Sequence, residues 1–238
     1  MAREFLSLLP HRFRQLYSKL MPIPCRLCGT MSQHHTICEV CLQNLPLLGD
    51  ACPRCALPIN NAYLCGHCLL QPPEQDLSFC LFPYLEPIDR LIADLKYHDK
   101  VFLSQFFAQL MADKLHHRPA PDILIPIPLH PNRLRQRGYN QSFELAKVLS
   151  VLLDIPTSNN YLSRIIDTKS QAAIPLKARK KNIQHAFKCI KTNLPRHVAI
   201  IDDVLTTGHT ANAAAKQLRQ AGATSIEVWT IARAIRHY

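Results

Sequence analysis

One stretch, Val198 to Thr210, restricts the fold of this 238-residue chain more than any other. An apolar run ends in two adjacent carboxylates, Asp202 and Asp203, and a loop of threonines with Gly208 follows. An alanine-rich pattern at helical spacing comes next, and Ser225 to Ile231 then has the pattern of a second strand. Because strand, loop, helix and strand in this order form a βαβ unit, the sequence predicts an α/β fold with a parallel sheet.

The loop in this unit has the composition of an anion site. Ligands of parallel sheets bind beyond the carboxyl ends of the strands, where the loop would lie. Backbone N–H groups and the positive end of the helix dipole favour a phosphate there, and Gly208 allows close approach. Ionised carboxylates only accept hydrogen bonds, so they suit sugar hydroxyls, directly or through Mg²⁺. The simpler alternative is a helix cap, although a cap needs only one such residue. The expected phosphate ligands are Thr206, Thr207, Gly208 and Thr210.

Eight of the ten cysteines form four C-x-x-C pairs in a tandem repeat with a period of 27 residues. Two such pairs supply the thiolates of a closed, structural Cys₄ zinc site, so we expect two Zn²⁺. The period favours one site per repeat, but a cross-braced pairing would use the same thiolates. Disulfides are the alternative, and the regular pairing argues against them. The candidate ligands are Cys25, Cys28, Cys38 and Cys41, then Cys52, Cys55, Cys65 and Cys68.

The overall charge favours an anionic partner. The formal net charge is +11, and eight thiolates with two Zn²⁺ would lower it to about +7. Nucleic acid and phosphorylated ligands both fit a basic protein. No apolar run is long enough to span a bilayer, and residues 1–22 suggest an amphipathic helix rather than an export signal. Ten cysteines without such a signal indicate a reducing, cytoplasmic location.

A second polar segment follows another expected strand, Ile123 to Ile127, which Pro126 and Pro128 would end. Three arginines alternate after it, and the prolines with Gly138 favour a loop. Guanidinium groups bind pyrophosphate with paired hydrogen bonds, so this loop is a candidate lid. A solvated basic face is the alternative. The arginines are Arg133, Arg135 and Arg137. Gln71 to Asp76 suggests a linker, and between it and this strand, apolar spacing predicts helices around Ile88 to Leu95 and Val101 to Leu115.

Two resemblances sharpen these expectations. The Asp-Asp and Thr-Thr-Gly-x-Thr stretch resembles the phosphoribosyl-pyrophosphate (PRPP) loop of type I phosphoribosyltransferases. Nearly the whole chain after Pro24 is similar to the ComF/GntX family of competence-associated proteins. The residues that carry the second resemblance are Pro126 to His130, Arg133 to Gln141, Leu145, Ala146, Gln171, Arg179, Asn182, Ala186 and Phe187, with the Asp-Asp loop and the cysteine repeats.

The resemblances imply a type I phosphoribosyltransferase-like domain over residues 77–238, after a double zinc ribbon over residues 23–76. They assign the ribose hydroxyls to Asp202 and Asp203, the 5′-phosphate to the threonine loop, and Mg²⁺ to bound PRPP. An acceptor base is not readable. Residues 157–188, with Lys169, Gln171, Arg179, Lys180, Lys181 and Asn182, are a candidate acceptor segment or a basic surface that faces DNA.

Three functions are then open. The favoured one is a cytoplasmic DNA-uptake factor of natural transformation that handles incoming single-stranded DNA and binds PRPP. The second is an active phosphoribosyltransferase with a nucleobase or nucleotide acceptor. The third is an adaptor whose zinc ribbons dock proteins of the uptake machinery.

Overall fold

The structure is a computed structural model, and it describes residues 23–32, 36–60, 63–167, 185–191 and 193–235. The chain divides into two compact units, Met1–Pro46 and Leu47–Tyr238. This boundary falls between the two cysteine repeats, so the second repeat belongs to the same unit as the sheet. The amphipathic helix predicted over residues 1–22 and residues 168–184 of the candidate acceptor segment lie outside the described residues.

The first unit consists of two short strands and a short helix around the first cysteine repeat. Strands β1 (Ile23–Pro24) and β2 (Met31–Ser32) pair antiparallel, and the short helix α3 (Glu39–Gln43) follows. Gly29 lies between the strands with φ +77°, a left-handed conformation that favours glycine. In the second repeat, the corresponding short helix is α4 (Gly66–Leu70).

The second unit is built on a four-stranded sheet in the order β3-β8-β7-β4, and every neighbouring pair is parallel. The strands are β3 (Leu77–Pro83), β4 (Ile123–Pro126), β7 (His197–Leu205) and β8 (Ser225–Arg233). Because β4 is an edge strand, Pro126 can end it without breaking a central ladder. The expected parallel sheet is therefore confirmed.

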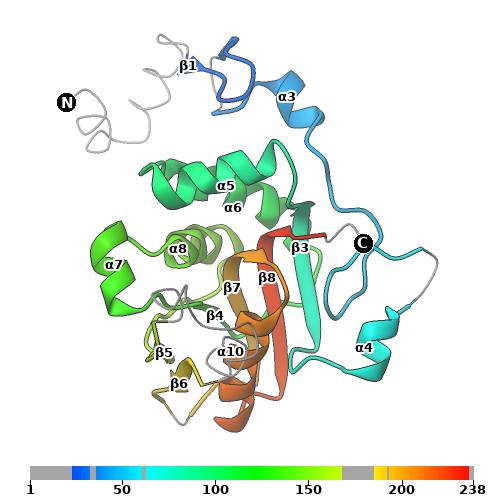
Figure 1. The fold of residues 1–238 in the computed structure, drawn as a ribbon, viewed down its shortest axis with the longest axis vertical. Coiled ribbons are helices and arrows are strands. Elements are labelled where there is room, and N and C mark those ends of the chain that lie inside the picture. Colours follow the sequence, from blue (N-terminus) through cyan, green and yellow to red (C-terminus); the bar gives the residue numbers. More distant parts are fainter. Residues whose placement is uncertain (1–22, 33–35, 61–62, 168–184, 192, 236–238) are drawn as a thin grey trace, which may run out of the picture. The chain divides into compact units, whose positions relative to one another are not determined.

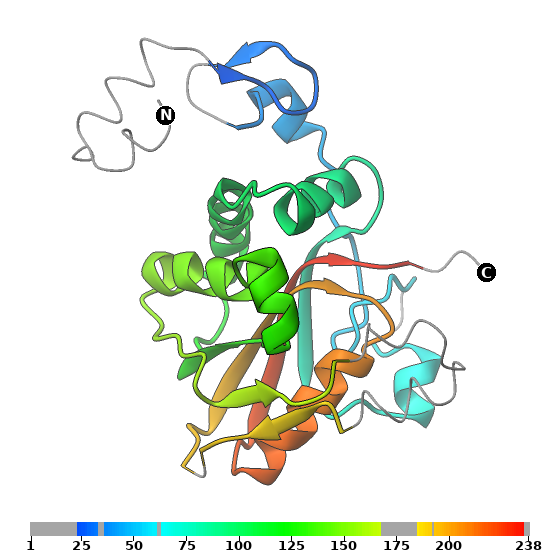
Figure 2. The same cartoon turned by 60° about the vertical axis from the view of Figure 1, so that its left-hand side comes forward.

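Helices cover both faces of this sheet (Figure 1, Figure 2). The helices α5 (Ile88–Tyr97), α6 (Phe102–Leu115) and α8 (Gln141–Leu153) form one layer, in which α8 contacts β4 and β7. Helix α10 (His209–Gln220) packs from the other side, beside the hairpin of β5 (Leu162–Arg164) and β6 (Phe187–Cys189). Burial on both faces explains why β7 is a nearly continuous apolar run.

The βαβ unit expected at the carboxyl end is present as β7, α10 and β8 (Figure 1). Val198 and Ile200 of β7 share a buried cluster with Ala214 and Leu218 of α10. The alanines let the helix lie close to the sheet, because their side chains add little thickness. Strand β7 continues to Leu205, so Asp202 and Asp203 lie among its last four residues rather than beyond its end.

One local expectation was wrong. The arginine segment, expected as a loop, is helix α7 (Pro131–Arg137). Pro131 occupies the first turn, where a missing N–H costs nothing, and the His130 side chain accepts from the Asn132 N–H. Gly138 ends the helix in the left-handed region, with φ +81°. These residues are start and stop signals of a helix. The sequence analysis interpreted the prolines and the glycine as loop markers instead.

Candidate functional site

The two carboxylates of β7 lie beside the amino end of α8. The Ser142 hydroxyl donates to Oδ1 of Asp202 at 2.9 Å, and the Gln141 side-chain amide donates to Oδ2 of Asp203 at 2.6 Å. Asn140 caps this helix by accepting from the Ser142 N–H. The capped helix end therefore positions two adjacent donors against two adjacent carboxylates.

Lys96, near the end of α5, forms an ion pair with Asp203. Its Nζ lies 2.7 Å from Oδ1, and the two side chains are 18% and 6% exposed. The Asp203 carboxylate is thus buried with two partners, whereas Asp202 is half-buried. Burial alone would disfavour the ammonium, but the charge of Asp203 raises the pKa of Lys96 above its ordinary value.

Asp202 differs from Asp203 in its electrostatics. Burial, followed by the negative charge of Asp203, raises the pKa of Asp202 to about 7, against the opposing charge of Lys96. The carboxyl therefore changes its charge near neutral pH. An arriving cation would favour the ionised form of Asp202.

The loop after β7 presents unpaired backbone donors. Among the described residues, the N–H groups of Thr206, Thr207 and Gly208 have no hydrogen-bond acceptor. Gly208 has φ +77° and is the N-cap of α10, and its carbonyl accepts from the Asn212 N–H. A Cβ at Gly208 would meet no atom within 4 Å, so the backbone conformation rather than space favours glycine. Unpaired N–H groups at the amino end of a twelve-residue helix form a cradle for an anion.

The three arginines of α7 are spread by the helix. Arg133 and Arg137 lie one turn apart and are half-buried, whereas Arg135 is exposed and donates to Asn132. Arg137 stacks over Tyr97, with its guanidinium carbon 5.1 Å from the ring centroid, and donates to Gln141. Arg137 is therefore already engaged near the carboxylates.

A fourth arginine, Arg164 of β5, belongs to the same region. Burial and the neighbouring charge of Arg133 lower its pKa, while the charge of Asp202 opposes that shift. Arg164 therefore senses both Arg133 and Asp202 electrostatically. Arg133 of α7, Arg164 of β5 and Asp202 of β7 therefore interact electrostatically, and such a group could take part in binding an anion with a divalent cation.

A cavity of about 450 Å³ adjoins the loop after β7, which we call the anion loop (residues 206–208). Thr206, Thr207 and Gly208 line it from the loop, and His67 and Cys68 line it from the second cysteine repeat. Both walls belong to the Leu47–Tyr238 unit. The loop is therefore bordered by a zinc-ribbon segment as well as by the sheet.

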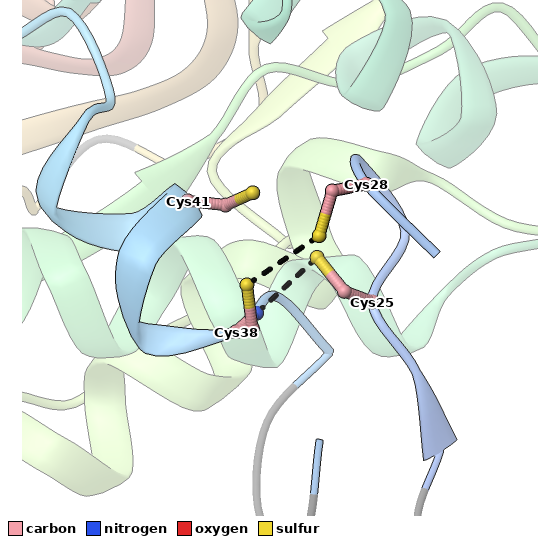
Figure 3. Close-up of side chains that lie close together, drawn as sticks. All are labelled: Cys25, Cys28, Cys38 and Cys41. Atoms are coloured by element: carbon pink, nitrogen blue, oxygen red, sulfur yellow. Dashed lines mark hydrogen bonds between the residues drawn. The ribbon is translucent and has the colours of Figure 1, made fainter. Parts of the chain in front are cut away.

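The eight paired cysteines gather into two clusters, one per repeat. Within each cluster all four sulfurs lie within 4.8 Å of one another, and Figure 3 shows the first cluster, where Cys28 Sγ and Cys38 Sγ are 3.6 Å apart. The corresponding sulfurs of Cys55 and Cys65 are also 3.6 Å apart. Four thiolates at ~2.3 Å from one zinc lie ~3.8 Å apart in a tetrahedron, so both clusters fit Zn²⁺. The grouping follows the sequential pairing.

Backbone donors favour ionisation of Cys25 in the first cluster. The N–H of Cys38 donates to Cys25 Sγ at 3.3 Å, as the dashed line in Figure 3 marks, and the N–H of Leu27 donates at 3.5 Å. Burial opposes ionisation of Cys25, but such backbone donors lower its pKa to about 6. A thiolate is the form that binds metal. When bound, Zn²⁺ would link the two knuckles of each repeat and stabilise a segment too small for a core of its own.

The sequence reasoning missed Lys96, Gln141, Ser142 and Arg164 as site residues. Gln141 and Ser142 directly follow the helix cap Asn140, and a polar pair at the buried start of an apolar helix was the available signal. Lys96 follows the apolar positions of α5, and only the tertiary fold brings it to Asp203. Nothing in the local sequence around Arg164 marks it.

The fold and the two cysteine clusters define a class: a zinc-ribbon protein with a parallel α/β sheet whose strand ends carry a polar site. A family model described as a double zinc ribbon domain matches residues 16–69. Competence protein F of Haemophilus influenzae is 38% identical over 71% of this chain and 78% of its own length. The DNA utilization protein YhgH of Escherichia coli K12 is 32% identical over 85% of this chain and 92% of its own.

The chain therefore belongs to the family of competence protein F and YhgH. Among solved structures, glutamine PRPP amidotransferase from B. subtilis is similar at 14% identity, covering 58% of this chain and 30% of its own, with a TM-score of 0.40. Within the described residues, no helix has the length and apolar character needed to cross a membrane.

Proposed function

We propose that this protein is a cytoplasmic DNA-uptake factor whose sheet edge binds PRPP with Mg²⁺. The observation that carries the proposal is the set of unpaired N–H groups at Thr206, Thr207 and Gly208, at the amino end of α10. They would hold the 5′-phosphate, and the hydroxyl of Thr210 would add a donor. The role in DNA uptake is supported by the names of the relatives, a competence protein and a DNA utilization protein.

Asp202 would contact the ribose hydroxyls, and Mg²⁺ would neutralise charge between ribose and pyrophosphate oxygens when PRPP is bound. Asp203 would act on the ligand indirectly, because its two carboxylate oxygens already bind Lys96 and Gln141. Arg133 is the lid arginine best placed for pyrophosphate. Arg137 is stacked on Tyr97, and Arg135 is exposed on the opposite side of the helix from Arg133. The cations would balance the charge of the ligand.

The test is calorimetric titration with PRPP in the presence and absence of Mg²⁺. Asp202→Asn keeps the shape of the side chain and removes the charge, so we expect affinity to fall by about tenfold. Asp113→Asn is the matched control, because that carboxylate is exposed on α6. Unchanged affinity in the Asp202 variant, or no binding by the native chain, would contradict the proposal.

Single-stranded DNA is the second expected ligand. The net charge of +11 supports contacts with phosphates. Fluorescence anisotropy with a labelled oligonucleotide should show affinity that falls steeply as salt rises. Binding that does not respond to salt, or its absence at low salt, would remove DNA from the proposal.

Docking of an uptake-machinery protein by the zinc ribbons stays a prediction, and pull-down with the full chain tests it.

Turnover of PRPP is the second candidate function. It is favoured by the two cations Arg133 and Arg164, since Arg164 interacts electrostatically with both Arg133 and Asp202, and such cations could stabilise pyrophosphate as it leaves. Transfer would break the bond from ribose C1 to pyrophosphate and form one to an acceptor nitrogen. Mg²⁺-dependent release of pyrophosphate across a panel of nucleobases and nucleotides tests it, and tight PRPP binding without release would restrict the site to binding.

A further inference from the structure

Arg233, the last residue of β8, joins the anion loop to the second cysteine cluster. Its side chain is buried, with a residue exposure of 6%. The Nε–H donates to the carbonyl of Cys55 at 2.7 Å. Nη1 donates to the carbonyls of Leu205 at 2.8 Å and of Thr206 at a short distance, and also to that of Ala234. One guanidinium therefore binds a backbone carbonyl of the second cysteine repeat, one at the end of β7 and one in the loop that follows it.

These bonds determine which way the loop donors point. A trans peptide is planar, so the carbonyl of one residue and the N–H of the next point in opposite directions. Because Arg233 holds the carbonyls of Leu205 and Thr206, the N–H groups of Thr206 and Thr207 point away from it. These two belong to the three unpaired donors of the anion loop. The bonds from Arg233 thus fix the direction of these two N–H groups.

The Cys55 carbonyl that accepts from Arg233 belongs to a residue of the second cysteine cluster. Cys55 is one of its four cysteines, and the turn around it is fixed by the Ala56 N–H, which donates to the Cys52 carbonyl at 2.7 Å. The Ser78 hydroxyl of β3 donates to the neighbouring Arg54 carbonyl at 2.7 Å. A metal bound by Cys55 would hold this turn, and hence the carbonyl that accepts from Arg233.

We propose that Arg233 is a positioning residue that couples the second zinc site to the anion loop. Loss of zinc from the second cluster, but not from the first, then weakens phosphate binding at the loop. The first cluster lies in the other compact unit, whereas Cys55, Arg233 and the loop belong to one unit. This inference rests on the proposed function, because it assumes that the loop receives the phosphate of PRPP.

The first arm of the experiment is Arg233→Lys in the full chain. The positive charge is kept while the planar fork is lost, so a loss of affinity reports geometry rather than charge. We expect PRPP affinity in calorimetry to fall by about tenfold, with two zinc ions per chain retained by metal analysis. Arg219→Lys is the control, because Arg219 also donates to carbonyls, of Glu74 and Thr224, but away from the loop.

The second arm compares Cys38→Ser with Cys65→Ser, which occupy equivalent positions in the two repeats. Each should lose one zinc, but only Cys65→Ser should weaken PRPP binding. The double variant Cys65→Ser with Arg233→Lys should bind PRPP with the same affinity as whichever single variant has the lower affinity. Both changes act on the loop through the same contact, so their effects should not add. Equal effects of the two cysteine variants, or full additivity in the double variant, would overturn the coupling.

Backbone amide NMR shifts separate this inference from the proposed function. Arg233→Lys and Cys65→Ser should shift the amide signals of Thr206 and Thr207, and Cys38→Ser should leave them in place. If these shifts occur but the native chain binds no PRPP, the coupling stands and the proposed ligand is wrong. If PRPP binds the native chain, yet Arg233→Lys changes neither shifts nor affinity, the coupling is wrong and the proposed function stands.

Discussion

Replacing Lys96 by Met should expose how strongly the fold depends on the Lys96–Asp203 ion pair. The two charges are 2.7 Å apart, and the Asp203 side chain is only 6% exposed. Without Lys96 the carboxylate keeps the hydrogen bond from Gln141 but loses its counter-charge. Removing one partner of a buried pair costs about 3 kcal/mol or more, because the other charge stays buried. For a domain of this size, that corresponds to a fall in melting temperature of about 6–12 °C.

The penalty should depend on pH with a definite sign. A buried carboxyl that has lost its counter-charge destabilises the fold only while it is ionised. Carboxyls become protonated in acid, so the penalty decreases as pH falls. The difference between native chain and variant should therefore be small near pH 4 and larger at pH 8.

The assay is thermal unfolding followed by the fluorescence of Trp229. This is the single tryptophan of the chain, and it is buried in the central strand β8, so it reports on the sheet. Lys114→Met is the control, because Lys114 is exposed on α6 and its loss should change stability by less than about 0.5 kcal/mol. The double variant Lys96→Met with Asp203→Asn should regain much of the loss. A penalty under about 1 kcal/mol, or one that is equal at pH 4 and pH 8, would refute the reasoning.

Three further predictions follow from the site. Because the pKa of Asp202 is raised to about 7, Mg²⁺-dependent PRPP binding should strengthen as pH rises from 6 to 8, and calorimetry that shows the opposite trend would contradict this role. Gly208→Ala should lower the free energy of unfolding by about 1 kcal/mol in urea titrations, since φ is +77° and the added Cβ has space; a gain in stability would show that the loop relaxes. Cadmium substitution should give two ¹¹³Cd signals, each coupled to cysteines of one repeat; coupling from one metal to both repeats would require cross-braced sites.

Much of the second unit could be predicted because its signals are local. The apolar run of β7, the alanine pattern of α10 and the strand β8 follow one another in the chain, so the βαβ unit needs no distant information. The cysteine period is equally local, because each Cys₄ cluster closes within one repeat. The segment of α7 carried its own signals as well, in Pro131 and Gly138, but these residues also mark loops and were interpreted as such.

The sequence by itself predicted the parallel βαβ unit, the two groups of four cysteines and the threonine-rich loop after β7, since each depends on residues that are close together in the chain. Only the tertiary structure decided the partners of these elements. Lys96 reaches Asp203 from α5, Arg164 approaches from β5, and Arg233 joins the loop to Cys55, residues far apart in sequence. Such contacts depend on how helices and strands pack around a shared core, and single-sequence periodicity carries no record of that packing.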